Sequence, residues 1–278
     1  VKAMFEDKEL AKELAAKGYQ FSSANSINIG RLVPQVVYYV YAYAKLLAHG
    51  EIEDGEKIDV VVPTGNFGNI LAAYYAKNMG VPINKLVCAS NENKVLFDFF
   101  QTGTYDKNRE FILTTSPSMD ILISSNLERL IYLITGEDSE KTGEFMNELK
   151  TGGKYEVAED MKAKLSDFEA GYATEEQTAQ MIHDVYAKAG YVMDTHTAVA
   201  AYVSQKLKEE GKLSEKCLVA STASPFKFVK SVMSAIDKKY ETADELALMD
   251  ILKETAGVEL PQAIKDILDA KVLHNLEC

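Results

Sequence analysis

The sequence predicts an α/β protein whose open, mostly parallel sheet is flanked by helices and followed by a helical C-terminal extension. Short apolar runs rich in β-branched residues alternate with segments of helical periodicity, and glycine or proline follows these runs abruptly. Residues 239–278 are acidic and helical in pattern. The 278 residues are 47% hydrophobic and 26% charged, which is typical of a folded globular chain.

The first elements are expected to form a βαβ unit. The apolar run 58–62 predicts a buried strand, because it is rich in valine and stops at a Pro-Thr-Gly sequence. A helix over 69–79 follows, and Gly80 suits the position just after its end. A second buried strand over 85–89 and a helix over 95–100 complete the unit.

The middle of the chain is expected to contribute one core helix and one insertion. Apolar residues recur at helical spacing over 120–134 and include Ile123, which indicates one face packed on a core. Residues 137–173 are crowded with Glu, Lys and Asp, and they predict an exposed, mostly helical insertion rather than sheet. Residues 25–136 and 174–238 are then expected to form one large α/β domain.

The second half of that domain begins with a clear helix signal. Thr174 and Gln177 have the spacing of a capping box. A second helix is expected over 197–210, and the apolar run 217–220 predicts a third strand, followed by the polar cluster 221–225. Three strands are few for this length, so the sheet is expected to have partners outside the chain.

Charge and composition exclude several classes of function. Lys and Arg number 30 and Asp and Glu 42, so the formal net charge is −12, which disfavours nucleic acid as a partner. The longest apolar run, 36–44, is far shorter than the roughly 20 residues of a membrane-spanning helix. Three scattered cysteines indicate neither a disulfide framework nor a metal cluster, and a cytoplasmic location is expected.

Residues 65–69 carry the most informative pattern in the sequence. Gly65 and Gly68 lie between a buried strand and a helix start, where backbone N–H groups can approach an oxyanion. The helix dipole adds roughly half a positive charge there, so a dianionic phosphate fits. The spacing matches neither nucleotide-binding glycine motif. Alternatively, the glycines only relieve backbone strain in a turn.

Two further clusters are candidates for binding. Asn25, Ser26 and Arg31 combine neutral donors with a guanidinium group and are expected to converge on a second phosphate. The alternative is a helix cap with Arg31 on a solvated face. Hydroxyl groups in 221–225 follow a strand and can bind a neutral ring nitrogen, or they cap the next helix. His196 is expected to be structural, and the helical tyrosines are expected to be core residues: Tyr38, Tyr39, Tyr41 and Tyr43.

Six motifs resemble those of the threonine synthases, which are pyridoxal phosphate enzymes of the tryptophan-synthase-β-like fold type. The motifs are NSINIGR (25–31), PTGNFGN (63–69), SNENKVL (90–96), SMDILISSNLERL (118–130), DTHTAVA (194–200) and STASPFKF (221–228). The resemblance covers nearly the whole chain. It implies a carbon-oxygen lyase acting on phosphate, which converts O-phospho-L-homoserine and water into L-threonine and phosphate in the last step of threonine biosynthesis.

The resemblance also implies a role for individual residues. The cofactor phosphate is expected to contact the backbone N–H groups of Gly65, Asn66, Phe67, Gly68 and Asn69. Thr222 is expected to face the pyridine nitrogen of the cofactor. The substrate phosphate is expected to contact Asn25, Ser26 and Arg31. Residues 1–24 then correspond to the end of a smaller domain or to a linker.

The sequence departs from the family at one decisive place. The Schiff-base lysine of the family lies upstream in a Phe-Lys-Asp context, which is absent here, and Lys227 belongs to a different motif. The sequence begins at Val1 without an initiator Met, so we expect a fragment that lacks the N-terminal domain of the same protein. The isolated chain is expected to be inactive and to bind free cofactor weakly. Thr195 and Ser224 stand where many relatives have Pro and His.

Two other functions remain open at this stage. One is another pyridoxal phosphate enzyme of the same fold type, such as a serine or threonine dehydratase, which has no substrate phosphate to hold. The other is a non-catalytic module that binds a phosphate-containing ligand. A helix that is apolar nearly all round, together with unpaired sheet edges, also makes a homo-oligomer plausible.

Overall fold

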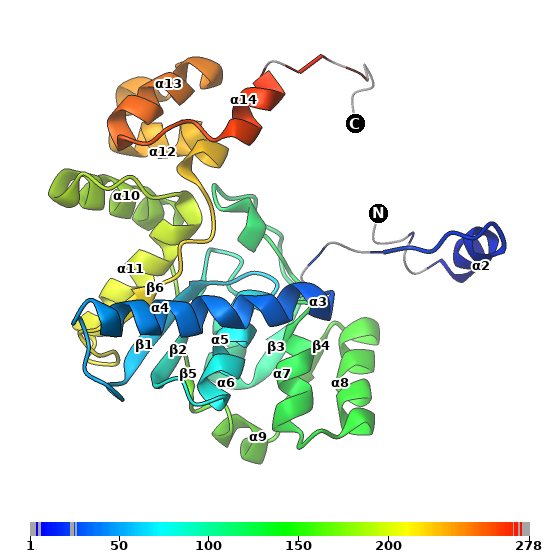
Figure 1. Ribbon diagram of the computed structural model, residues 1–278. Helices are drawn as coiled ribbons and strands as arrows, with labels where there is room; N and C mark the ends of the chain where they lie inside the picture. Colours follow the sequence, from blue (N-terminus) through cyan, green and yellow to red (C-terminus); the bar gives the residue numbers. More distant parts are fainter. Residues whose placement is uncertain are drawn as a thin grey trace.

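The computed structural model describes residues 4, 7–22, 25, 27–268, 270–271 and 273. Its centre is a four-stranded sheet in the order β5-β2-β1-β6, in which every neighbouring pair is parallel (Figure 1). The strands are β1 (Ile58–Pro63), β2 (Ile83–Ser90), β5 (Phe168–Tyr172) and β6 (Cys217–Val219). A separate antiparallel pair consists of β3 (Thr104–Asp106) and β4 (Lys154–Glu156). The expected α/β fold with an open parallel sheet is therefore confirmed.

Helices pack on both faces of the sheet because successive strand residues point to opposite sides. Val60 and Val62 belong to a core shared with α4, α5 and α6, whereas Val61 belongs to a core shared with α11. These helices are α4 (Val36–Ala48), α5 (Gly68–Asn78), α6 (Val95–Thr102) and α11 (Thr195–Glu209). The central strand β1 is thus buried on both sides, as its continuous apolar sequence predicts.

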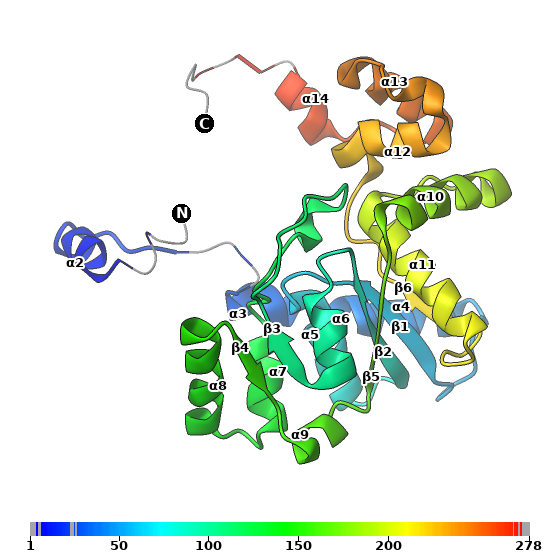
Figure 2. The ribbon, with the colours of Figure 1, turned by 180° about the vertical axis from the view of Figure 1, so that it is seen from behind.

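The other helices extend the fold away from the sheet. They are α2 (Lys8–Ala16), α3 (Ile29–Leu32), α7 (Leu127–Ile134), α8 (Ser139–Thr151), α9 (Glu159–Ala163), α10 (Glu175–Ala189), α12 (Val229–Ile236), α13 (Glu245–Ala256) and α14 (Gln262–Leu268). Four 3-10 helices are η1 (Val33–Gln35), η2 (Pro117–Met119), η3 (Pro225–Phe228) and η4 (Lys238–Tyr240). Helices α10, α12 and α13 share their own apolar core. Helix α2 buries none of its residues and lies apart from the sheet in both views (Figures 1 and 2).

Most of the expected elements are confirmed. Strands occupy the three apolar runs assigned to them, and the capping box of Thr174 and Gln177 is formed at the start of α10. The described part of the C-terminal segment is helical, as predicted. None of the helices among the described residues combines the length and apolarity needed to cross a bilayer. Those residues also contain no group of three His, Cys, Asp or Glu side chains arranged to hold a metal ion.

The prediction that residues 137–173 form an exposed, mostly helical insertion rather than sheet is wrong in part. Strand β4 pairs with β3, and Tyr155, Met161 and Phe168 are buried in the core. Helices α8 and α9 form, but β5 joins the main sheet beside β2 and provides its fourth strand. An edge strand tolerates charge, and Glu169 of β5 lies 3.6 Å from the Lys85 ammonium group of β2. Gly171 allows close packing on α11, because a Cβ there would lie 2.5 Å from a Val203 methyl carbon. The many charged residues of the 137–173 segment therefore prevented the prediction of β5 from the sequence.

The predicted helix over 120–134 begins only at Leu127, and Ile123 is 48% exposed rather than packed on the core. Polar side chains just before α7 bond to another segment instead of continuing a helix, as serine and asparagine often do. The tyrosine prediction is correct only in part. Tyr39 and Tyr43 are buried, whereas Tyr38 and Tyr41 are each 61% exposed.

Candidate functional site

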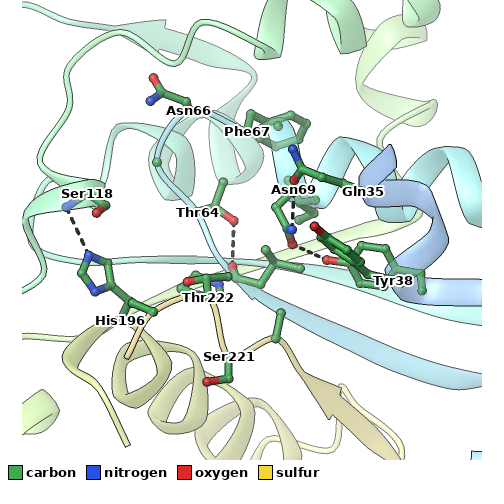
Figure 3. A pocket seen from close by; sticks show the side chains of 18 of the residues that line it. Gln35, Tyr38, Thr64, Asn66, Phe67, Asn69, Ser118, His196, Ser221 and Thr222 are labelled. Atoms are coloured by element: carbon green, nitrogen blue, oxygen red, sulfur yellow. Dashed lines mark hydrogen bonds between the residues drawn. The ribbon is translucent and has the colours of Figure 1, made fainter. Parts of the chain in front are cut away.

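A cavity of about 870 Å³ lies where the carboxyl ends of β1 and β6 meet helices α3 and α4 (Figure 3). Three stretches contribute most of its lining: residues 30–42, residues 62–70 and residues 218–223. Ser118, His196 and Lys227 complete it. Open parallel sheets bind their ligands at the carboxyl ends of the strands, so this position is the one expected of a functional site.

The loop between β1 and α5 lines the cavity and leads into the N-terminus of α5. Phe67 precedes α5 with a left-handed backbone (φ 63°), and no side chain caps the helix. Its ring is 1% exposed and packs 6.0 Å from the rings of Phe100 and Phe168. The helix N-terminus therefore keeps its N–H donors and its partial positive charge for another partner.

The carbonyl groups of the same loop are held by the segment that precedes α7. The Ser124 hydroxyl donates to the Gly65 carbonyl at 2.7 Å, and Asn126 donates to the Asn66 carbonyl from its backbone at 3.0 Å and its side chain at 2.9 Å. Every peptide bond among the described residues is trans. The N–H groups of Asn66 and Phe67 therefore point away from the carbonyls just before them. These two N–H groups, here called the donor array, therefore point away from residues 124–126.

Gly65 is required by close packing. A Cβ atom at this position would lie 2.4 Å from the backbone carbonyl oxygen of Ser118 and 3.3 Å from the Cα atom of Met119. Helix η2 therefore presses directly on the loop. This contact fixes the loop's position from the side opposite to α4.

Two cations line the cavity. Arg31 lies in the last turn of α3, and Lys227 lies in η3 with its ammonium group 5.7 Å from the centre of the Phe228 ring. Among the residues described as lining the cavity, none is Asp or Glu. A chain with a net charge of −12 therefore has a locally positive cavity, and this sign favours an anionic ligand.

The structure brings together most of the residues selected from the sequence. Gly65, Asn66, Phe67, Gly68, Asn69, Thr222 and Arg31 all line the cavity. Asn25 is not among the lining residues, and its side chain accepts a hydrogen bond from the Ile27 N–H at 3.2 Å. Asn28 caps α3, so the helix-cap alternative holds for part of this segment. Ser26 lies outside the described residues.

Comparison with known proteins shows which proteins have a similar sequence and fold. A family model described as "Threonine synthase, C-terminal" matches residues 197–272. Threonine synthase from Saccharomyces cerevisiae is 37% identical, over 94% of this chain and 54% of that protein. The crystal structure of pyridoxal phosphate-bound threonine synthase from Brucella melitensis superposes with a TM-score of 0.76 at 36% identity, over 97% of this chain and 52% of that one. Residues 197–272 are therefore a threonine synthase C-terminal domain, and most of the chain is similar to threonine synthases.

The chain spans about half the length of these threonine synthases. It is also similar to the human protein named threonine synthase-like 1, at 43% identity over 86% of this chain and 32% of that protein. The match with the threonine synthase from Brucella melitensis includes nearly the whole α/β unit and the C-terminal helices. The fold around the cavity is therefore the fold of this family.

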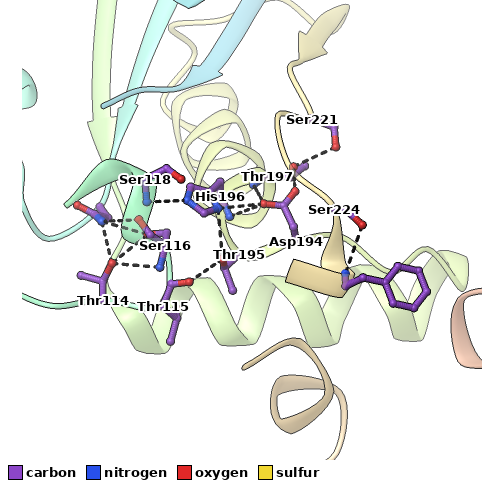
Figure 4. A network of polar contacts seen from close by, with 12 residues as sticks. Thr114, Thr115, Ser116, Ser118, Asp194, Thr195, His196, Thr197, Ser221 and Ser224 are labelled. Atoms are coloured by element: carbon purple, nitrogen blue, oxygen red, sulfur yellow. Dashed lines mark hydrogen bonds and ion pairs between the residues drawn. The ribbon is translucent and has the colours of Figure 1, made fainter. Parts of the chain in front are cut away.

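A buried histidine bonds to the segment that packs against Gly65 (Figure 4). The Ser118 N–H donates to His196 Nε2 at 3.1 Å, so the neutral ring carries its proton on Nδ1. Nδ1 lies 3.2 Å from a carboxylate oxygen of Asp194, which also accepts the His196 N–H at 2.9 Å as the cap of α11. His196 is 2% exposed, as its expected structural role requires. It nonetheless touches the cavity.

Asp194→Ala is expected to lower the free energy of unfolding by about 2–4 kcal/mol at neutral pH, because a helix cap and the partner of a buried histidine are lost together. Burial raises the pKa of Asp194, but hydrogen bonds from His196 and Thr197 outweigh it, so the pKa lies below its usual value. The carboxylate therefore stabilises the fold above its unfolded-state pKa, and this contribution disappears as pH falls through the lower folded-state pKa.

Urea unfolding at pH 7 and at progressively lower pH measures this effect. Asp244→Ala is the matched control, because Asp244 caps α13 from an exposed position and is expected to cost only about 1 kcal/mol. Equal losses in the two variants, or a constant difference between wild type and Asp194→Ala down to acid pH, would contradict the assigned role.

Several polar lining residues were not selected as site residues from the sequence, among them Lys227, Gln35 and Ser118. Lys227 was set aside because its motif has another assignment in the family. Gln35 and Ser118 carry no local signature, although Gln35 follows Arg31 by one helical turn and Ser118 begins one of the family motifs. Asn91 and Asn93 do not line the cavity. Instead they donate hydrogen bonds to Asp120 at 2.8 and 3.0 Å and so fix the 114–120 loop.

Proposed function

We propose that this chain is the C-terminal part of a threonine synthase, which converts O-phospho-L-homoserine and water into L-threonine and phosphate with pyridoxal phosphate as cofactor. The observation that carries the proposal is that one positively charged cavity is lined by the 65–69 loop, Thr222 and Arg31 together. These are the elements that the reaction needs for two phosphate groups and one aromatic ring.

The cofactor phosphate would contact the backbone donors of residues 65–69. The donor array, the uncapped N-terminus of α5 and the space preserved by Gly65 fit a dianion. The Thr222 hydroxyl is neutral and would hydrogen-bond the pyridine nitrogen without carrying a charge there. Bound at this site, pyridoxal phosphate supplies the electron sink for the β,γ-replacement.

Arg31, which lines the cavity, would hold the phosphate of the substrate. Asn25 and Ser26 remain predicted neutral donors to the same phosphate. Phosphate is the leaving group in this reaction, so its negative charge grows as the bond between the γ-carbon and oxygen breaks. A guanidinium group stabilises that charge more in the transition state than in the bound substrate, and this difference lowers the barrier. The departing phosphate would thus be bound by a side chain of opposite charge, that of Arg31.

Arg31 also separates this proposal from a dehydratase. The substrate of a serine or threonine dehydratase carries no phosphate group. Arg31 would therefore have no substrate phosphate to bind in such an enzyme. Because the chain is also similar to threonine synthase-like 1, cofactor binding alone would not identify the reaction. The product that forms is therefore the decisive measurement.

The test uses a longer protein that contains this chain and an upstream region with the cofactor lysine. With pyridoxal phosphate and O-phospho-L-homoserine, it is expected to release threonine and inorganic phosphate in equal amounts, and to act poorly on L-serine and L-threonine. The 278-residue chain alone is expected to release neither product. Cofactor absorbance without threonine formation would favour a binding module, and keto-acid production from serine would favour a dehydratase.

A further inference from the structure

Two side chains outside the predicted phosphate ligands connect the segment that contains Arg31 to the 65–69 loop. We propose that Arg129 and Gln35 are positioning residues, which hold these two phosphate-binding segments at a fixed separation. The inference rests on the proposed function, because it concerns how the two phosphates are placed relative to each other. Neither residue is assigned a direct contact with a ligand.

The first connection runs through Arg129 in α7. One guanidinium nitrogen donates to the backbone carbonyl of Ile27 at 2.8 Å, and another donates to the side-chain oxygen of Asn126. Asn126 in turn donates twice to the Asn66 carbonyl, at 2.9 and 3.0 Å. The path from residue 27 to residue 66 is therefore an unbroken series of hydrogen bonds. Arg129 does not itself line the cavity, so it acts through Asn126 and Ile27.

The second connection runs through Gln35, on the opposite side of the cavity. Its side-chain nitrogen donates to the backbone carbonyl of Arg31 at 2.9 Å. Its side-chain oxygen accepts a hydrogen bond from the Asn69 side chain at 3.1 Å (Figure 3). Asn69 is held further by the hydroxyl of Tyr39. One amide group thus joins the residue expected to grip the substrate phosphate to the last residue of the cofactor loop.

These groups suit a positioning role because of their shape. A guanidinium group is planar and presents its donors in a rigid fork, so it fixes the direction between two acceptors, which a flexible ammonium group does not. A primary amide similarly offers a donor and an acceptor at fixed geometry. The 27–31 segment is largely exposed, and the buried Leu32 anchors it to the core only at its C-terminal end, so these bonds help to hold Arg31 in place. Displacing a binding group by about 1 Å can cost as much as two orders of magnitude in rate.

The experiment compares Arg129→Met and Gln35→Leu in the longer, cofactor-loaded protein. Each is expected to raise the KM for O-phospho-L-homoserine about tenfold, with a smaller change in kcat and unchanged cofactor absorbance. In the apoprotein, the Kd for inorganic phosphate should rise in parallel. Amide hydrogen exchange of residues 27–32 should become faster in both variants, while exchange within β1 and β2 remains at wild-type rates.

The matched controls are Arg109→Met and Gln205→Leu. Arg109 pairs with Asp98 at 2.6 Å, and Gln205 donates to Glu209 at 2.8 Å on α11, both away from the cavity. Neither control should change KM or local exchange. Arg129→Lys provides a variant that keeps the charge, and it is expected to leave most of the defect in place because one ammonium group does not reproduce the fork.

The outcomes separate this inference from the proposed function. If the wild-type protein forms no threonine, the proposed function fails, and hydrogen exchange still tests the two connections. If the wild-type protein is active but both variants keep their KM, phosphate affinity and exchange rates within twofold, the inference fails alone. Full recovery by Arg129→Lys would also overturn it, because charge rather than geometry would then be sufficient.

Discussion

Gly65→Ala is expected to raise the Kd for pyridoxal phosphate by at least about 100-fold in the longer protein, the largest effect predicted for any single methyl group. The added carbon would lie 2.4 Å from the Ser118 carbonyl oxygen. This oxygen belongs to the backbone, so it cannot move aside by a change of side-chain rotamer. The loop or helix η2 must therefore move. Either shift tilts the N–H groups of residues 66–68 away from the phosphate. Absorbance titration of the apoprotein with the cofactor measures the loss.

Gly143→Ala is the control for this substitution. Gly143 lies inside α8, and a Cβ there would meet no atom within 4 Å. The control should leave cofactor affinity unchanged and stabilise the helix by about 0.5–1 kcal/mol. If Gly65→Ala bound the cofactor within threefold of wild type, the close contact with Ser118 would not determine the position of the loop.

Arg31→Ala is expected to raise the KM for O-phospho-L-homoserine by about 100-fold, which corresponds to about 2–3 kcal/mol for a charge-assisted phosphate contact. Cofactor absorbance should not change, because Arg31 belongs to α3 rather than to the 65–69 loop. Steady-state kinetics with the phosphorylated substrate, together with competition by inorganic phosphate, measure the effect.

Arg109→Ala removes an equally charged side chain that lies outside the cavity, and its kinetic constants should match those of wild type. Arg31→Lys should recover part of the affinity, because it keeps the charge but loses the two-pronged geometry. A parallel loss of substrate affinity and cofactor absorbance in Arg31→Ala would contradict the separation of the two phosphate sites.

The sequence predicts those parts of the fold that depend on neighbouring residues. The buried strand β1 is apolar because both of its faces are covered, and the loop after it contains glycine because backbone must approach other groups closely. Strand β5 cannot be predicted from an apolar sequence in the same way. It lies at the edge of the sheet, where Glu169 is tolerated, and only its pairing with β2 defines it as a strand. Likewise, residues 120–126 have helical spacing but are drawn away by bonds to the loop at 65–66.

The residues of the candidate site also divide into those with a sequence signature and those without one. The 65–69 loop has a local signature, and Arg31 and Thr222 were found through motifs that span the chain. Ser118 is far in sequence from the other lining residues. Gln35 and Lys227 lie only four and five residues after the selected Arg31 and Thr222, but no local pattern marks them. His196 has an evident position in its motif, yet the bond from Ser118 that defines its proton location joins residues 78 apart.

The position of β1 has a consequence for how the chain acquires its structure during synthesis. The buried carboxylate of Asp59 accepts hydrogen bonds from Lys85 beside it and from Ser214, which lies 155 residues downstream. Strand β6 can pair with β1 only after residues 217–219 have been synthesised. A nascent chain that ends before residue 214 therefore holds the carboxylate of Asp59 without its hydrogen bonds from Ser214, and β1 acquires its full set of partners only after that point.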